Sequence, residues 1–305
     1  MNEGVAYFLG ICFSGLTRGS IYALMALGYT LVYGILSLIN FAHGEVYMIG
    51  AFVGLVFAGL GTILGLGPVA NAALALGAAI VWAGAYGFIL ERVAYRPLRR
   101  APRLAPLITA IGMSLFLREF VILAQTSDFV AFPPLFEALP SLPQGWGEFV
   151  LPSELLILCS TLAVLFGLYL LVQHSKMGLA MRSIAQDPEM ARLLGIDVDK
   201  IISFTFVLGS ALAAVGAVLI SAQIGQINAN IGFIVGIKAF TAAVLGGVGS
   251  PGGAALGGLV LGLTESLAAG YLSSDYEDGF AFLVLVLILL FRPAGLVGKN
   301  LPEKV

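Results

Sequence analysis

The chain has 305 residues, of which 59% are hydrophobic and only 10% are charged, and its formal net charge is −2. Its mean hydropathy is +1.01. Soluble domains carry about 25% charged residues, so this composition excludes an ordinary water-soluble protein and predicts a membrane protein. The net charge says little by itself, because the position of the basic residues is what orients a membrane protein.

The N-terminal region and the cysteines carry no processing or metal signal. Residues 1–4 hold no basic residue before the apolar stretch, so we expect the first helix to remain in the mature protein. Cys12 and Cys159 lie alone in distant apolar segments. Neither a metal site nor a disulfide framework can be derived from that spacing.

Apolar segments long enough to cross a bilayer as helices recur along the chain. We expect an all-α, polytopic transmembrane helix bundle of about eight spans, some of them broken or re-entrant, in a single domain over residues 1–305. The expected spans are residues 19–38, 41–60, 68–90, 104–124, 151–172, 201–224, 236–270 and 279–291. Residues 4–17 are either a short interfacial helix or an extension of the first span.

Basic residues gather in two short loops and in the tail. The loops contain Arg92, Arg96, Arg99, Arg100 and Arg103, and Lys176, Arg182, Arg192 and Lys200. Because Lys and Arg are retained in the cytoplasm, we expect both loops and the C-terminus there. The loop of residues 125–150 has no Lys or Arg and is expected to be external. Counting back then puts the N-terminus outside.

Polar residues interrupt the apolar sequence at the junction of the first two spans. Asn40, His43, Gly44 and Tyr47 have the spacing of one helical face, and Glu45 lies among them. Asn40 is the predicted N-cap of the following helix. The free amides and partial positive charge of a helix N-terminus can hold a carboxylate. This junction is therefore a candidate border of a substrate path.

A second helix start is predicted within the apolar segment 236–270. Gly246, Gly247 and Gly249 end one helix, Ser250 can cap the next, and Pro251 suits its first turn. Interrupted helices in both halves of a chain are typical of the substrate path of transporters.

Each of these features has a simpler interpretation. Asn40 and Ser250 could cap helices at the membrane surface, and His43 could be a hydrogen-bonded structural residue. Four glycines of the last third are typical of close helix packing: Gly253, Gly257, Gly258 and Gly262.

Ionisable residues within the spans should face the bundle interior or extend to a boundary. They are Glu45, Arg118, Lys238 and Glu265. Lys238 could pair with Glu45 or with another carboxylate, and the sequence does not choose between them.

The cytoplasmic loop of residues 174–200 contains a predicted short helix. Asp187 caps it, Pro188 and Glu189 begin it, and Gly195 ends it. Its apolar residues are Met190, Leu193 and Leu194. They could enter the groove of a soluble partner, or the helix could lie on the inner leaflet.

Motifs for ATP hydrolysis and for common intramembrane enzymes are absent from the sequence. The nearest candidate for a phosphate-binding loop, residues 295–299, lacks the upstream glycine and the following Ser or Thr. No H-E-x-x-H or G-x-S-x-G occurs. We therefore expect a transport subunit and not an enzyme, with no cofactor in this chain.

Six stretches carry a family resemblance: residues 19–24, 39–50, 91–97, 191–196, 238–247 and 292–296. On these the chain resembles, over essentially its whole length, the LivH-type permeases of branched-chain amino-acid ABC importers. Arg18 departs from the apolar residue expected there. The resemblance implies a multi-pass protein of the bacterial inner (cytoplasmic) membrane that imports Leu, Ile or Val by alternating access.

The partners implied by the resemblance are a second, related permease subunit in a heterodimer, two ATPase subunits that use ATP, an external substrate-binding protein and membrane lipid, but no nucleic acid. By the same resemblance, the ATPase-coupling residues are Asp187, Pro188, Glu189, Arg192, Leu193, Leu194 and Gly195. The candidate pathway residues are Tyr22, Asn40, His43, Gly44, Glu45, Tyr47, Thr241, Gly246, Gly247, Gly249 and Ser250, with Lys238 and Glu265 as intramembrane charges.

Two other functions remain open from the sequence. One is a related ABC permease for urea, amides or other amino acids. The other is an ion-driven secondary transporter with Glu45, His43 or Lys238 as a relay.

Overall fold

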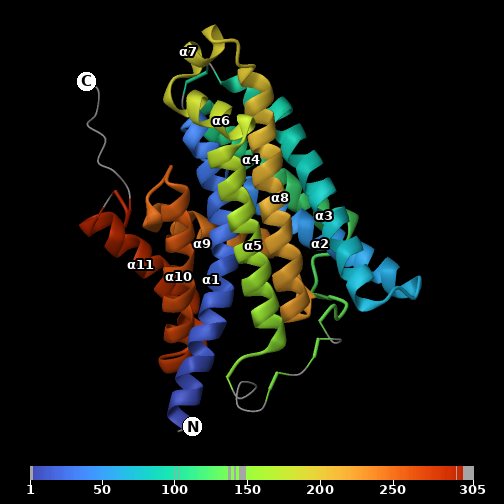
Figure 1. Cartoon of the computed structure of the whole chain (residues 1–305). Helices are drawn as coiled ribbons and strands as arrows, with labels where there is room; N and C mark the ends of the chain where they lie inside the picture. The colour runs from blue at the N-terminus through green and yellow to red at the C-terminus, as the bar shows by residue number, and fades with distance from the viewer. Residues whose placement is uncertain are drawn as a thin grey trace.

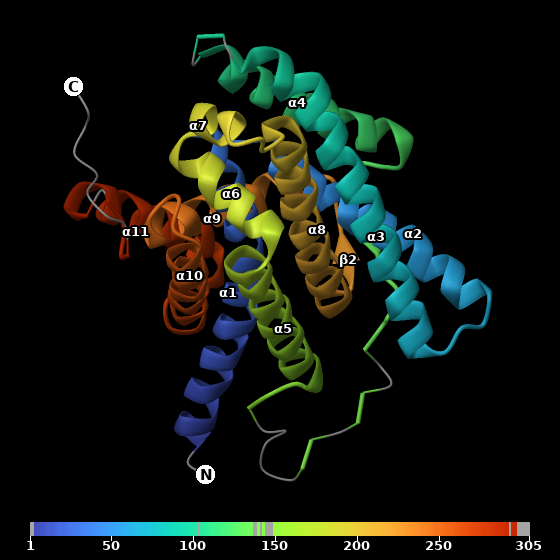
Figure 2. The same ribbon diagram turned by 45° about the horizontal axis from the view of Figure 1, so that its top comes forward.

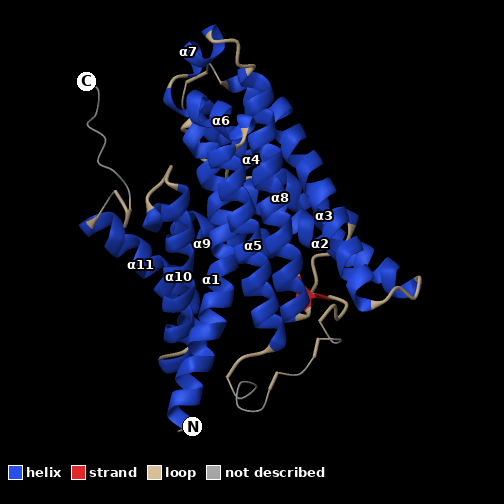
Figure 3. Cartoon of the chain, in the orientation of Figure 1, coloured by secondary structure: helices blue, strands red, loops and turns tan. Residues whose placement is uncertain are grey.

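The computed structural model describes residues 3–99, 101–102, 104–136, 139–140, 142–143, 149–292 and 294–297. This part of the chain is almost entirely helical (Figure 3). The α-helices are α1 (Glu3–Leu36), α2 (His43–Ile63), α3 (Pro68–Leu90), α4 (Leu104–Ala124), α5 (Pro152–His174), α6 (Lys176–Gln186), α7 (Pro188–Leu193), α8 (Val198–Ile224), α9 (Ile231–Gly246), α10 (Pro251–Tyr271) and α11 (Glu277–Phe291). The remaining elements are the π-helix η1 (Glu91–Tyr95), the 3-10 turns η2 (Arg96–Leu98) and η3 (Ser274–Tyr276), and the strands β1 (Val130–Ala131) and β2 (Gln226–Ile227).

Among the described residues, seven helices are long and apolar enough to cross a membrane. They are α1, α2, α3 with its continuation to Leu98, α4, α5, α8 and α10. The predicted all-α transmembrane bundle is confirmed, and the segment 236–270 is interrupted as predicted, because α9 has only 16 residues and a separate α10 follows it. Residues 4–17 are an extension of the first span, since α1 is continuous from Glu3 to Leu36.

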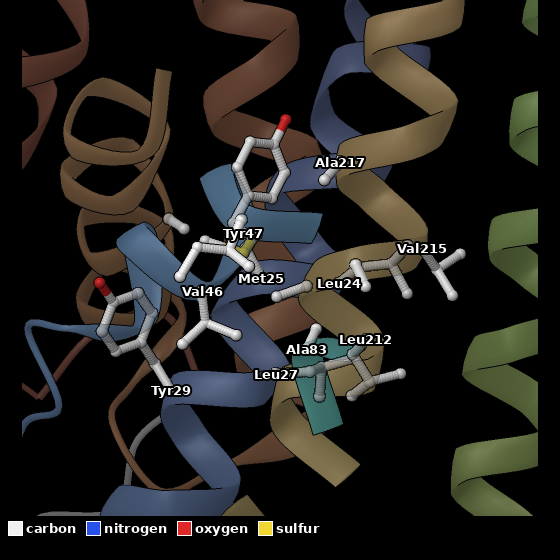
Figure 4. Packing of buried hydrophobic residues seen from close by; sticks show 14 of the residues in the cluster. Leu24, Met25, Leu27, Tyr29, Val46, Tyr47, Ala83, Leu212, Val215 and Ala217 are labelled. Carbon is white, nitrogen blue, oxygen red and sulfur yellow. The ribbon is translucent and has the colours of Figure 1, made fainter. Parts of the chain in front are cut away.

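Helix α1 lies in the middle of the bundle and packs against α5, α8, α9 and α10 (Figures 1 and 2). Its segment from Ser20 to Val32 is buried throughout. Figure 4 shows how Leu24 and Leu27 of α1 pack with Val46 of α2 and Leu212 of α8. Lipid is as apolar as these side chains, so close van der Waals fit holds such helices together more than exclusion of water does.

The contact between α1 and α10 is a seam of glycines. A Cβ atom on Gly19 would lie 2.8 Å from the carbonyl oxygen of Gly258 and 2.9 Å from the Cα of Leu259. A Cβ on Gly262 would in turn overlap the backbone of Gly19. The two backbones are thus in direct contact, and the predicted packing role of the late glycines is confirmed.

The ends of α8 define the two sides of the bundle. At its start, Asp199 accepts hydrogen bonds from Arg96 and Arg99, which brings the two basic loops together. At its other end, β2 pairs with β1 in the loop of residues 125–150, with Val130 opposite Ile227. The N-terminus lies at the end of the bundle opposite α7 (Figure 1). The positive-inside rule predicts the basic loops in the cytoplasm, so the N-terminus and the loop of residues 125–150 are expected outside.

Candidate functional site

The start of α2 is held by a tertiary contact and not by the predicted cap. Ala42 is the N-cap and makes no side-chain cap. Asn40 is buried and its Oδ1 accepts a 2.7 Å hydrogen bond from the hydroxyl of Tyr95 in η1. The prediction of Asn40 as N-cap is wrong, because its side chain is committed to a residue that lies far from it in the sequence.

His43 and Tyr47 point into the packed core. The ring of His43 lies 4.8 Å from that of Tyr29 and against Gly28 of α1. Tyr47 is fully buried. These positions fit the structural interpretation of His43, and neither residue lines the cavity beside the start of α2.

A cavity of about 330 Å³ lies beside the start of α2, between α2, α4, α9 and α11. Its lining is Tyr29, Phe41, Glu45, Ile111, Ser114, Leu115, Arg118, Gly232, Phe233, Gly236, Ile237, Phe240 and Leu285. We name it the α2–α4–α9 cavity. Of the predicted pathway residues, Glu45 lines it, whereas Tyr22, Asn40 and Thr241 are buried elsewhere.

Glu45 and Arg118 bring opposite charges to the α2–α4–α9 cavity. Glu45 is 1% exposed, and its Oε1 accepts a 3.0 Å hydrogen bond from the hydroxyl of Ser114. Its Oε2 has no partner among the described residues, and neither does the Nε of Arg118. One Nη of Arg118 bonds to Glu119 at 3.2 Å. The cavity therefore holds a buried carboxylate and a guanidinium with unused hydrogen-bonding capacity.

Helix α9, whose start was not predicted from the sequence, faces α2 across this site. Helix α9 begins at Ile231, and the backbones of Gly44 and Gly232 are in close contact, because a Cβ on Gly44 would overlap the carbonyl of Gly232. Two helix starts therefore meet beside the cavity. Asn228 and Asn230, which precede α9, were a turn signal that could have indicated this break.

The second predicted junction forms as expected but lies elsewhere. Ser250 caps α10 by accepting a 3.2 Å hydrogen bond from the amide of Gly253, and Pro251 begins the helix. Gly247 and Gly249 have φ values of +107° and +89°, which glycine adopts without strain. This turn, with Gly246, pairs with the segment after α11 through the bond from Leu296 N to Leu245 O, 2.8 Å. It does not line the α2–α4–α9 cavity.

Lys238 is part of a charge cluster between α1, α9, α10 and α11. Its Nζ lies 2.8 Å from Glu265 and 2.6 Å from Asp278. Glu265 also accepts a 3.0 Å hydrogen bond from the hydroxyl of Tyr22, and Arg18 lies 3.0 Å from Glu277. The suggested pairing of Lys238 with Glu45 is wrong. Arg18 tolerates its position in α1 because α10 and α11 bring carboxylates to it.

The loop of residues 174–200 folds as the sequence predicts. Oδ1 of Asp187 caps α7 by accepting 2.9 Å hydrogen bonds from the amides of Glu189 and Met190. Pro188 begins the helix, and Gly195 follows it with φ +85°. Leu193 and Leu194 are 81% and 75% exposed. Glu189 and Arg192 are exposed as well. The loop thus presents exposed apolar side chains at the end of the bundle opposite the N-terminus.

An ionic network joins this loop to the bundle. Asp197 caps α8, and the hydrogen bond from the Lys200 side chain holds the pKa of that carboxyl below its usual value. Asp199, the second residue of α8, binds Arg96 and Arg99, and Arg99 also pairs with the buried Glu91 of η1. Ser203 of α8 donates a 2.5 Å hydrogen bond to the same Glu91. The start of α8 is thereby tied to η1, whose Tyr95 binds Asn40 before α2.

Comparison with known proteins finds relatives over the full length. The chain is 47% identical over 309 residues to the high-affinity branched-chain amino acid transport system permease protein LivH of Escherichia coli K12, with 100% of both chains covered. It is 49% identical over 304 residues to the corresponding BraD of Pseudomonas aeruginosa, with 99% of both chains covered. It is also 26% identical to the E. coli permease protein LivM, over 94% of this chain and 70% of LivM.

A family model supports the same relationship. Residues 11–289 match the model described as the permease component of the branched-chain amino acid transport system. The matched region includes η1, α7 and every residue that lines the α2–α4–α9 cavity. With its seven long apolar helices, the protein is a multi-pass protein of the inner membrane. The chain belongs to the family of branched-chain amino acid transport permease components.

Proposed function

We propose that this chain is one of the two channel-forming subunits of an ATP-driven importer that carries branched-chain amino acids into the cytoplasm by alternating access. The observation that carries the proposal is the full-length similarity to LivH and BraD, both high-affinity branched-chain amino acid permease proteins. The weaker similarity to LivM supports a second, related permease subunit as the partner in a heterodimer.

The energy for transport comes from ATPase subunits that dock on the cytoplasmic loop, and an external binding protein delivers the substrate. The exposed side chains of Met190, Leu193 and Leu194 on and after α7 support a docking role, since an apolar face in water favours a partner's groove. The link from Asp199 through Arg99 to η1 gives this loop a rigid connection to the transmembrane helices. ATP binding and hydrolysis in the partners then switch the access of a central cavity.

The docking assignment is tested with Leu194→Asp. A carboxylate at this exposed position cannot enter an apolar groove without a desolvation cost, so we expect the ATPase subunits to co-purify in at most about a tenth of the wild-type amount. Leu272→Asp is the control, because Leu272 is 68% exposed but follows α10 at the opposite end of the bundle. Unchanged co-purification of Leu194→Asp would exclude α7 as the docking helix.

The substrate is tested by uptake of labelled leucine into cells that express the chain with its partner genes. Excess isoleucine or valine should abolish the uptake, and excess urea should not. Leucine uptake that resists vanadate and collapses with an uncoupler would instead indicate an ion-driven transporter, and competition by urea would indicate the related amide importers.

A further inference from the structure

The α2–α4–α9 cavity contains a charge that the protein leaves unsatisfied. Glu45 is 1% exposed, and within the described chain its Oε2 accepts no hydrogen bond. A buried carboxylate oxygen without a donor is costly, especially in a membrane. A Cβ on Gly232 would lie 2.8 Å from this oxygen, so the glycine is what leaves space beside it. The missing partner is a donor, and an ammonium group supplies three.

The second charged group of the cavity, after the carboxylate of Glu45, is the guanidinium of Arg118. Ser114 and Arg118 are one turn apart on α4, so the residue that holds Glu45 and the residue that carries the positive charge line the same cavity. The only ion pair of Arg118 in the described residues is with Glu119, whose side chain is 56% exposed. A guanidinium binds carboxylates with paired N–H groups, so Arg118 keeps donors for an anionic group inside the cavity.

The remaining lining is apolar and sets the kind of ligand that fits. Aliphatic side chains come from α4, α9 and α11, and aromatic rings from Phe41, Phe233 and Phe240. The volume of about 330 Å³ lies at the small end of the usual range for ligand pockets. A carboxylate and a guanidinium beside an apolar wall match a small molecule with an ammonium group, a carboxylate and an aliphatic side chain.

We propose that the α2–α4–α9 cavity is a binding site for a zwitterionic aliphatic amino acid, in which Glu45 binds the α-ammonium group and Arg118 binds the α-carboxylate. This assignment rests on the proposed function and deepens it by naming the residues of this chain that recognise the substrate after the binding protein has released it. Ser114 is a positioning residue, because it acts by holding Glu45.

The test measures ligand stabilisation of the purified permease assembly without binding protein and without ATP. A ligand that binds only the folded state raises the melting temperature with its concentration, even when its affinity is weak. The probes are leucine, isocaproate, which is leucine without its amino group, and isoamylamine, which is leucine without its carboxylate. The melting temperature of the wild-type protein should rise at a lower concentration of leucine than of the other two ligands, because only leucine can bind both Glu45 and Arg118.

Two variants test the roles of Glu45 and Arg118 separately. For Glu45→Gln, the leucine concentration that gives half of the shift should rise at least about tenfold, the usual effect of losing a charged hydrogen bond, while the response to isocaproate is unchanged. For Arg118→Gln, the leucine concentration that gives half of the shift should rise similarly, while the response to isoamylamine is unchanged. Glu119→Gln is the control, since it removes a nearby carboxylate that is outside the cavity, and it should bind leucine like the wild type.

The results that would overturn the proposal are distinct from a failure of the proposed function. If leucine does not stabilise the wild-type assembly at any concentration while leucine uptake is intact, the importer stands and this site is wrong. The site is also wrong if both variants keep wild-type leucine binding or lose all three ligands alike. Should a variant fail to fold, the order of the three ligands on the wild-type protein still decides.

Discussion

At the scale of single residues, the charges around Lys238 are paired across helices. Glu265 is fully buried, yet it contacts Lys238 of α9, Tyr22 of α1 and, at 3.8 Å, Arg18. Asp278 of α11 contacts the same Lys238. Because each desolvated charge has its partner on another helix, the cluster holds α1, α9, α10 and α11 in one arrangement.

Lys238→Met should therefore be strongly destabilising. The change leaves Glu265 buried without its nearest cation, and breaking a buried pair costs about 3–5 kcal/mol. The measurement is the midpoint of thermal unfolding of the purified protein. Lys200→Met is the control, because Lys200 pairs with Asp197 on the surface and its side chain is 83% exposed. Equal midpoints for the two variants would contradict the structural role of the cluster.

At the scale of elements, the connection between the cytoplasmic loop and the cavity runs through η1. Asp199 of α8 binds Arg99, and Arg99 binds Glu91 of η1. Tyr95 at the end of η1 donates to Asn40, three residues before α2 begins. π-helical turns often occur at functional sites. A movement of the loop of residues 174–200 therefore has a path of direct contacts to the helix that carries Glu45.

Asp199→Asn should weaken this connection. The neutral amide loses the charged hydrogen bonds to Arg96 and Arg99, so we expect leucine uptake to fall about tenfold while the ATPase subunits remain bound. The readouts are uptake and co-purification on the same preparation. Asp197→Asn is a matched control, because asparagine is as good an N-cap as aspartate and Asp197 does not contact either arginine. If Asp199→Asn takes up leucine at the wild-type rate, the ion pairs of Asp199 do not couple the loop of residues 174–200 to transport.

At the scale of the whole molecule, the arrangement has two chemically distinct ends. The ion pairs of Arg96 and Arg99 and the apolar tip of α7 lie at one end, and the pairing of β1 with β2 lies at the other. The distribution of basic residues predicts that the first end faces the cytoplasm.

The orientation is tested by cysteine labelling in a background with Cys12 and Cys159 replaced by Ser. Leu193→Cys and Phe129→Cys place thiols at positions that are 81% and 68% exposed, at opposite ends of the bundle. A membrane-impermeant maleimide should label Phe129→Cys on intact cells and Leu193→Cys only after permeabilisation. The reverse pattern would invert the topology.

The sequence predicts the features of this protein that depend on neighbouring residues. Asp187, Ser250 and Gly195 are correctly assigned because a cap or a left-handed turn is decided within a few positions. Asn40 is not, since its hydrogen bond comes from Tyr95 in another element. The side chain of a potential cap residue is a hydrogen-bond acceptor, and the tertiary structure decides which donor binds to it.

The cavity could not be derived from the sequence for the same reason. Arg118 could be recognised as an ionisable residue within a span, but its position opposite Glu45 depends on how α4 packs beside α2. The break before α9 has no proline, and its Asn228 turn resembles many ordinary loops. Long-range pairings such as Lys238 with Glu265 likewise have no local signal.

The seam between α1 and α10 has a mechanical consequence. Because Gly19 and Gly262 are in backbone contact, neither helix can slide or rotate against the other without a steric collision. Helices α1 and α10 therefore behave as one rigid unit. Helix α4 is the opposite case: only Pro106, Ala110, Leu117 and Val121 along its length are buried. A movement of α4 would carry Arg118 with it, whereas Glu45 would stay in place, because it lies on α2 within a fully buried stretch.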